Sequence, residues 1–163
     1  MRPMFALISF SLFATCASSA HAQGYSFLAQ DKSSAFRAAG YNLVGGQWRK
    51  CEDHEGPGYT AGAVKIVGDL NGDARPEAII TEESSYCYGM AGTTFDLVSK
   101  QIDGSWKLMA SGIGIPKFLT TKGVGGWPDI EIGGPGFCFP VERWNGKEYQ
   151  NHRQQYEGKS CED

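Results

Sequence analysis

The order of apolar and polar residues predicts one short helix followed by a long β-rich region. Residues 31–39, DKSSAFRAA, combine good helix formers with Asp31 at a capping position, and Gly40 follows where a left-handed residue closes a helix. Beyond Gly40 the apolar runs are too short for helices and are rich in aromatic and β-branched residues. The pattern therefore predicts a helix over residues 31–39 and sheets over residues 61–163.

Seven segments have the length and composition of β-strands. They are residues 63–67, 77–81, 93–100, 106–110, 130–132, 137–144 and 147–156. Two dipeptides, Asp103-Gly104 and Asn145-Gly146, separate consecutive strands and favour the positive φ angles of tight hairpin turns. We expect a mainly β fold of antiparallel sheets, blade-like or sandwich-like, with one short N-terminal helix.

A weak internal repeat links two of the predicted strands. Residues 75–80, RPEAII, and 126–132, GWPDIEI, each place an acidic residue between a proline and an apolar run. Such a repeat suggests blade-like units, and chance similarity of two strand openings is the alternative. Because two units cannot close a propeller, the sheets must cover each other or be covered by the helix.

Residues 1–22 have the layout of a secretory signal peptide. Arg2 precedes an apolar run over residues 4–14, and small residues precede a cleavage position before Gln23. The run is shorter than the roughly 20 residues that a permanent membrane helix requires. We therefore expect cleavage before Gln23 and a periplasmic or secreted protein, with lipidation of Cys16 as the alternative.

Charge and length then narrow the organisation and the partners. Residues 23–163 are enough for one domain and carry 14 basic and 18 acidic residues, without a basic stripe or a block of like charge. We expect neither nucleic acid nor an anionic membrane as a partner. The predicted state is a monomer without a transmembrane segment.

Four cysteines lie beyond the leader, and an even number in an exported chain predicts two disulfides. Three pairings exist. We favour Cys51 with Cys87 and Cys138 with Cys161, because each pair brackets one half of the chain and the second would hold the C-terminal tail. Zinc is the competing explanation, but the sequence has no Cys-x-x-Cys and its remaining His residues are isolated.

One loop concentrates oxygen-bearing side chains. In residues 68–77, GDLNGDARPE, they recur at alternate positions counted from Asp69, and the carbonyl of Arg75 can supply a further ligand. Calcium takes about six to eight oxygen ligands and suits a loop that presents one at every second residue. The spacing therefore predicts a calcium loop between two strands.

This loop resembles the calcium loop of FG-GAP and VCBS-type repeats, whose pattern D-x-[DN]-x-D-G-x-x-D leads into a strand. The resemblance implies that Asp69, Asn71, Asp73 and Glu77 bind a structural Ca²⁺ through their side chains and that Arg75 binds it through its carbonyl. A loop without metal, in which Asp69 and Asn71 make local turn hydrogen bonds, is the alternative.

Two positions depart from that pattern. Ala74 stands where the pattern has Gly to allow a positive φ, at a cost of about 1 kcal/mol, and Glu77 replaces Asp. Residues 121–126, ahead of the second repeat, have lost the carboxylates, so we expect no metal there. More loosely, the region from Cys51 to Cys161, with stretches such as GWPDIEIGGPGFCFP and RWNGKEY, resembles small exported bacterial proteins of unassigned function.

Two cysteine-containing loops are candidate recognition surfaces. Residues 84–92, SSYCYGMAG, and 133–140, GGPGFCFP, set aromatic residues among glycines around a cysteine. A disulfide would hold such loops rigid, so that little entropy is lost on binding. The alternative is that the aromatic residues fill the core beside the disulfides. The candidate binding residues are Tyr86, Tyr88, Trp127 and Phe137.

The sequence offers little for catalysis. It has no Gly-x-Ser-x-Gly elbow, its cysteines are assigned to disulfides, and both His54 and His152 have the character of surface residues. Acidic residues could form the carboxylate pair of a glycoside hydrolase, although we interpret them as solvent-facing. These acids are Glu82, Glu83, Asp129 and Glu131.

The favoured hypothesis is an exported, non-enzymatic binding or stabilising module with a calcium loop, whose partner is an envelope glycan or protein. An inhibitor of an exogenous enzyme such as lysozyme is a related alternative. A cell-wall hydrolase that uses a carboxylate pair is an alternative from another class.

Overall fold

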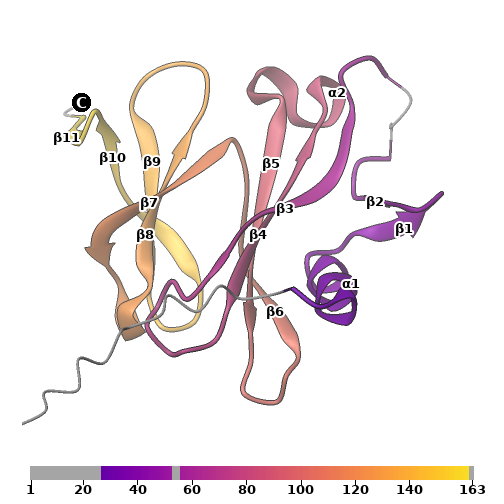
Figure 1. Cartoon of the computed structure of the whole chain (residues 1–163). Coiled ribbons are helices and arrows are strands. Elements are labelled where there is room, and N and C mark those ends of the chain that lie inside the picture. Colours follow the sequence, from indigo (N-terminus) through magenta and orange to yellow (C-terminus); the bar gives the residue numbers. More distant parts are fainter. Residues whose placement is uncertain (1–26, 53–55, 162–163) are drawn as a thin grey trace, which may run out of the picture.

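Three layers of secondary structure make up the protein. The computed structural model describes residues 27–52 and 56–161, without the side chains of residues 66 and 67. Figure 1 shows a five-stranded sheet on the left, a four-stranded sheet in the middle, and a helix with a small hairpin on the right. The predicted signal peptide with its cleavage position, Cys16, and His54 lie outside the described residues.

The outer layer beside the four-stranded sheet consists of α1 (Ala29–Ala38) and the hairpin of β1 (Asn42–Val44) and β2 (Gln47–Arg49). The predicted helix is confirmed, although it begins before Asp31. Asp31 does not cap the helix, because its carboxylate accepts hydrogen bonds from Lys100 Nζ at 2.8 Å and Trp106 Nε1 at 3.2 Å. This carboxylate therefore ties α1 to the four-stranded sheet.

The middle layer, here called the first sheet, is antiparallel, and its strands follow one another in chain order. They are β3 (Thr60–Gly68), β4 (Glu77–Glu83), β5 (Thr93–Lys100) and β6 (Trp106–Ile113). The two central strands, β4 and β5, are buried along almost their whole length. Other layers cover both faces of these strands, so polar residues such as Glu77, Glu82 and Asp96 are buried together with the apolar ones.

The second sheet is also antiparallel and runs in chain order. Its strands are β7 (Ile115–Lys122), β8 (Pro128–Gly133), β9 (Phe139–Trp144), β10 (Tyr149–Tyr156) and β11 (Lys159–Ser160). The sequence did not predict β7, which is an edge strand and contains Pro116. Proline is tolerated at an edge because no second neighbour requires its N–H.

Three short helical turns interrupt the sheets: α2 (Ser85–Tyr88), η1 (Gly89–Ala91) and η2 (Val124–Gly126). The sequence did not predict α2, a single turn whose N-cap Ser84 accepts a hydrogen bond from the Cys87 N–H at 3.2 Å. No helix among the described residues is long and apolar enough to cross a membrane.

In the described part of the chain, one apolar core lies between each pair of neighbouring layers. One lies between the first sheet and the outer layer, where Phe36 of α1 stacks on Trp48 of β2 with ring centroids 4.9 Å apart. The other joins the two sheets. Its buried members are Ile79, Phe95, Leu97, Ala110, Trp127, Ile130 and Trp144. The first sheet is thus covered by the helix on one face and by the second sheet on the other, as the repeat required.

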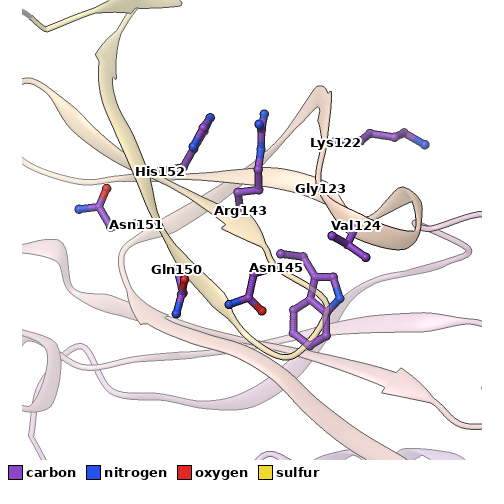
Figure 2. A pocket seen from close by; sticks show the side chains of 9 residues that line it. Lys122, Gly123, Val124, Arg143, Asn145, Gln150, Asn151 and His152 are labelled. Atoms are coloured by element: carbon purple, nitrogen blue, oxygen red, sulfur yellow. The ribbon is translucent and has the colours of Figure 1, made fainter.

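The two predicted hairpins are confirmed, but their turns are longer than two residues, since the last pairs are Lys100 with Trp106 and Trp144 with Tyr149. Asp103 and Asn145 do not take a positive φ. Instead, each accepts hydrogen bonds from backbone N–H groups two or three residues ahead. Figure 2 shows Asn145 at the turn between β9 and β10.

The two copies of the weak repeat take equivalent positions in the two sheets. Pro76 immediately precedes β4, and Pro128 begins β8, which are the second strands of their sheets. The residues after these prolines, Glu77 and Asp129, are both buried carboxylates. The repeat therefore corresponds to two similar antiparallel units packed face to face.

Two disulfides close the loops that follow these strands. Cys51 pairs with Cys87 and Cys138 pairs with Cys161, with Cα–Cα distances of 6.0 and 5.8 Å. The favoured pairing is confirmed. The first bridge ties the segment after β2 to α2, and the second ties the loop between β8 and β9 to the C-terminal segment after β11.

We predict that removal of the second disulfide destabilises the domain by about 3 kcal/mol, because the bridge closes a loop between residues 23 positions apart. The variant is Cys138→Ser with Cys161→Ser, and urea unfolding measures the loss. Ser160→Ala, an exposed neighbour, is the control. An unchanged urea midpoint in the double variant would contradict the prediction.

Candidate functional site

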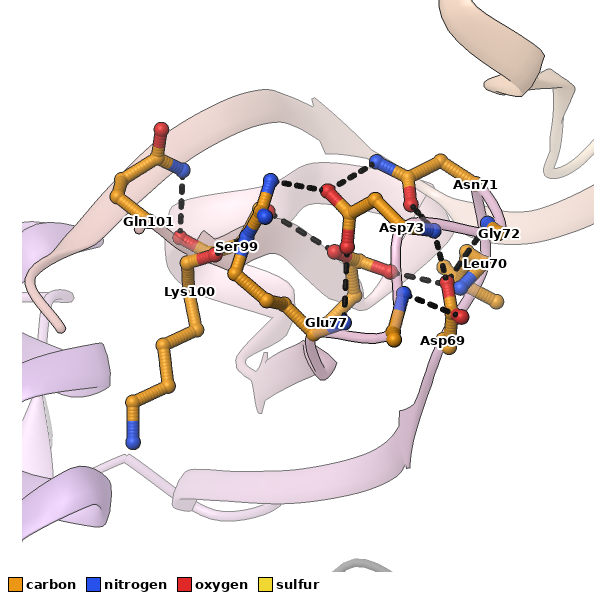
Figure 3. Close-up of polar contacts among 11 residues, drawn as sticks. Asp69, Leu70, Asn71, Gly72, Asp73, Glu77, Ser99, Lys100 and Gln101 are labelled. Atoms are coloured by element: carbon orange, nitrogen blue, oxygen red, sulfur yellow. Dashed lines mark hydrogen bonds and ion pairs between the residues drawn. The ribbon is translucent and has the colours of Figure 1, made fainter. Parts of the chain in front are cut away.

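The loop between β3 and β4, residues 69–76, is held by its own acidic side chains (Figure 3). Both carboxylate oxygens of Asp69 accept backbone N–H groups, with Oδ1 2.7 Å from the Gly72 nitrogen and Oδ2 2.9 Å from the Ala74 nitrogen. Asn71 Oδ1 accepts the Asp73 N–H at 3.0 Å. These are the local turn hydrogen bonds that a loop without metal would also make.

Ala74 has the positive φ that the calcium-loop pattern assigns to glycine, at 65°. The loop therefore adopts the expected bend despite the substitution. The Asp73 carboxylate is already engaged within the protein. It accepts the Arg75 N–H at 2.8 Å and forms an ion pair with the Arg75 guanidinium. The Arg75 guanidinium is thus a cation, belonging to the protein itself, that pairs with an acidic side chain of the loop.

Glu77 lies beneath the loop and is almost completely buried. It accepts the Leu70 N–H at 2.7 Å and the Ser99 hydroxyl at 2.9 Å, so it joins the loop to β5. Burial raises the pKa of Glu77 to about 7, against these hydrogen bonds, which lower it. Only above that pH is the carboxylate ionised in most molecules.

The donor set of the loop has the chemistry of a calcium site, but its oxygen atoms are directed to other groups of the protein. Within residues 27–52 and 56–161, no three His, Cys, Asp or Glu side chains are arranged to hold a metal ion. The loop also rests on the second sheet: a Cβ added at Gly126 would lie 2.5 Å from the Asn71 carbonyl oxygen. The two equivalent loops of the repeat are therefore in contact.

A second candidate site lies between the two disulfide-linked loops, which Figure 1 places at the same end of the molecule. A groove of about 450 Å³ separates them. Met90 and Ala91 of the first loop form one wall, and Gly133, Gly134 and Pro135 form the other. Ile115 lies between the walls, together with an ion pair of Lys117 and Glu131 whose charged atoms are 3.4 Å apart. We call this feature the loop groove.

In the described part of the chain, none of the four predicted binding residues lines the loop groove itself. Tyr86 and Phe137 stand on its two loops with 77% of their surface exposed, which favours the recognition interpretation over core filling. Phe137 also packs edge-on against Tyr156, with ring centroids 5.3 Å apart. Trp127 is buried in the core between the sheets, packed against Trp144, and is not offered to a ligand.

Tyr88 is committed to an internal network around Glu82. The fully buried Glu82 carboxylate accepts hydrogen bonds from the hydroxyls of Tyr59 and Tyr88 and from the Cys51 N–H at 2.9 Å. Burial, and then the Glu82 contact, raise the pKa of Tyr88 above its ordinary range. This network fixes the first loop and its disulfide from below.

The interpretation of Glu82, Asp129 and Glu131 as solvent-facing acids is wrong, because all three are buried, and only Glu83 is exposed. Asp129 lies on the face of the second sheet that points away from the first. Arg143 binds it with two N–H groups, at 2.9 and 2.8 Å, and Arg153 and Thr121 donate to the same carboxylate. The long side chains of Arg143 on β9 and Arg153 on β10 cover the Asp129 carboxylate. The sequence alone does not show on which face of the sheet these arginines lie.

Asp129 is therefore a poor general acid. Burial by itself would raise its pKa, but the hydrogen bonds from Arg143, Thr121 and Arg153 outweigh burial and hold the pKa well below its ordinary value. A glycosidase of the two-carboxylate type requires one acid that stays protonated near neutral pH. Asp129 does not meet that requirement.

Comparisons of the chain with protein-family models, curated proteins and solved structures found no match. The FG-GAP-like resemblance of the loop at residues 69–77 therefore remains a prediction from its sequence.

Three residues that line the loop groove could not be identified as site residues from the sequence. Met90 lies in a glycine-rich loop, and Ile115 and Lys117 lie on β7, which the sequence did not predict. Their exposure, 90% for Met90 and 64% for Ile115, is the signal that identifies them, and it requires the fold.

We predict that Asp129→Asn destabilises the protein by about 2 to 3 kcal/mol at neutral pH, since two guanidinium groups lose their buried partner. Because the folded-state pKa of Asp129 is lowered, its contribution is present above the ordinary value of 3.8 and is lost as pH falls below it. Urea unfolding should therefore show the gap between wild type and variant narrowing below about pH 4.

Glu83→Gln, which changes an exposed acid in β4, is the control and should leave the unfolding free energy nearly unchanged. A gap between wild type and Asp129→Asn that stayed constant from neutral to acidic pH would contradict the ion-pair account.

Proposed function

We propose that this protein is an exported, non-enzymatic binding module that holds an apolar segment of a partner protein in the loop groove. The observation that carries the proposal is the convergence of two disulfide-linked loops around one groove. A disulfide pair and an export leader belong to the same oxidising compartment. The partner is accordingly expected in the cell envelope or outside the cell.

Rigidity supports this role. The first loop is fixed by the Cys51–Cys87 bridge and the Glu82 network, and the second by the Cys138–Cys161 bridge. Groups held in place before binding lose less conformational entropy when a partner arrives. The loops therefore supply a preformed surface.

The chemistry of the loop groove favours a protein segment over a glycan. Its walls consist of Met90, Ala91, Pro135 and glycine backbone, and Ile115 adds an exposed apolar side chain. Methionine adapts its shape to varied apolar side chains. The ion pair of Lys117 and Glu131 offers one polar anchor to the backbone of an extended segment. An apolar side chain flanked by extended backbone is the expected binding determinant.

A non-enzymatic role agrees with the state of the buried acids. Both oxygens of Asp129 accept charged hydrogen bonds, and the two oxygens of Glu82 accept from backbone and tyrosine groups. Carboxylates so engaged serve to hold neighbouring groups in place. Neither is free to transfer a proton to a substrate.

We predict that peptides selected from a phage-displayed random library on the oxidised protein share an apolar anchor residue. Their affinity should fall at least about tenfold with Met90→Asp or Ile115→Asp, because a charge would be desolvated in the groove. Fluorescence polarisation of the selected peptides measures the change.

Ile102→Asp is the matched control, since Ile102 is 92% exposed in the turn between β5 and β6, at the opposite end of the first sheet. Equal losses for Ile102→Asp and Met90→Asp would contradict the groove as the binding site. Selection of glycans but no peptides from parallel arrays would contradict the choice of a protein partner. A lysozyme is the first whole protein to test against the same variants.

We also propose that calcium stabilises the loop at residues 69–77 through the side chains of Asp69, Asn71, Asp73 and Glu77 and the Arg75 carbonyl. The sequence spacing and the bend at Ala74 support the proposal. Calcium must then take Asp73 away from the Arg75 guanidinium, so the affinity is set by competition with an internal cation.

We predict that calcium at 100 times its dissociation constant raises the unfolding free energy by about 2.7 kcal/mol relative to EDTA, which is several degrees in melting temperature. The measurement belongs at pH 8, where Glu77 is ionised. The shift should vanish in Asp73→Ala and persist in Asp103→Ala, a turn acid of the β5–β6 hairpin. Identical melting curves in EDTA and calcium would show that Arg75 serves as the only cation of the loop.

A further inference from the structure

A second pocket, of about 490 Å³, lies where the loop after β7 meets the hairpin of β9 and β10. Its volume falls in the range of about 300 to 1,000 Å³ that small-molecule sites occupy. It shares no lining residue with the loop groove. We call it the hairpin pocket.

The shape of the hairpin pocket depends on a close backbone crossing. A Cβ added at Gly123 would lie 2.3 Å from the Trp144 carbonyl oxygen, so only glycine allows the loop to approach the end of β9. Val124, next in the loop, is 57% exposed and lies on one side of the pocket. The crossing places the exposed apolar side chain of Val124 beside polar side chains from β9 and β10.

The lining side chains that carry charge are all basic or imidazole: Lys122, Arg143 and His152. Figure 2 shows Arg143 and His152 extending in the same direction from neighbouring strands, with Lys122 reaching out from the end of β7. Within the part of the chain that the structure describes, the side chains of Lys122 and His152 make no hydrogen bond or ion pair. These two groups are therefore available to a ligand.

A break in the strand register brings His152 to this position. Asn151 pairs with Glu142 and Arg153 pairs with Val141, so His152 is the extra residue of a β-bulge. Bulges commonly redirect a side chain beside a binding site. The bulge lies directly opposite the strand that carries Arg143.

Asp129 positions the Arg143 guanidinium. Its carboxylate engages Nε and Nη2, which fixes the plane of the group and leaves Nη1 without a hydrogen bond among the described residues. A guanidinium fixed in this way presents a directed donor to a carboxylate. Arg153 shares Asp129, so this cluster keeps a net positive charge in a protein that is negative overall.

Three amide side chains complete the lining. Asn151 has no side-chain partner in the described part of the chain, Asn145 keeps its amino group free, and Gln150 keeps its carbonyl oxygen free while donating to Glu148 at 3.1 Å. Amides both donate to and accept from hydroxyl groups. Cations, amides and a small apolar surface together suit a ring that bears a carboxylate and several hydroxyls.

We propose that the hairpin pocket binds an acidic saccharide, with the carboxylate held by Lys122, Arg143 and His152 and the hydroxyls held by the amides of Asn145, Gln150 and Asn151. This site is independent of the protein-binding role assigned to the loop groove. It adds carbohydrate recognition at a separate place on the same domain.

The test uses D-glucuronate, D-glucose and acetate as probes in NMR titrations of the oxidised, mature protein at low salt. Glucuronate should shift the signals of Gly123, Asn151 and His152 and bind at least about tenfold more tightly than glucose or acetate. Lys122→Ala and His152→Ala should each weaken glucuronate binding about fivefold without altering the fold, because neither side chain has an internal partner.

Lys65→Ala, an exposed lysine on β3 of the first sheet, is the matched control and should bind glucuronate as the wild type does. Absence of shifts at the hairpin pocket would overturn the site. Equal binding of acetate and glucuronate would overturn the saccharide assignment. Loss of peptide binding at the loop groove in Met90→Asp leaves these titrations unaffected, so the two proposals fail separately.

Discussion

The apolar contact between the two sheets determines where the loop groove lies and how the loop at residues 69–76 is supported. Phe95 and Leu97 of the first sheet pack against Ile130 and Trp144 of the second. That contact brings the loop around Met90 next to the loop around Pro135, although more than forty residues separate them in sequence. It also presses Gly126 against the carbonyl of Asn71.

Buried carboxylates fix the segments that the sheets bring together. Glu82 holds the first disulfide loop, Glu77 holds the loop after β3, and Asp129 orients the guanidinium of Arg143. The hydrogen bonds that each receives offset part of the cost of burial, and for Asp129 the charged donors outweigh that cost. The same type of residue, placed at the start or end of a second strand, thus performs a comparable task in both halves of the fold. In these positions acids act as structural anchors.

Much of the fold was predictable because it follows from local patterns. The helix, both long hairpins and the disulfide pairing each depend on a few neighbouring residues or on the order of the cysteines. Strand β7 was missed because Pro116 and its polar end obscure the pattern of an edge strand. The burial of Asp129 was missed because Arg143 and Arg153, distant in sequence, cover it. The exposure of Met90 and Ile115 depends on which sheet edges meet.

The central claim is that two loops from different halves of the chain form one binding surface. Amide hydrogen exchange of the oxidised protein, with and without a peptide selected for binding, tests it most directly. The account predicts slowed exchange in both residues 85–92 and residues 133–137, with residues 101–105 at the opposite turn unchanged. Protection confined to one of the two loops, or spread evenly over the sheets, would contradict it.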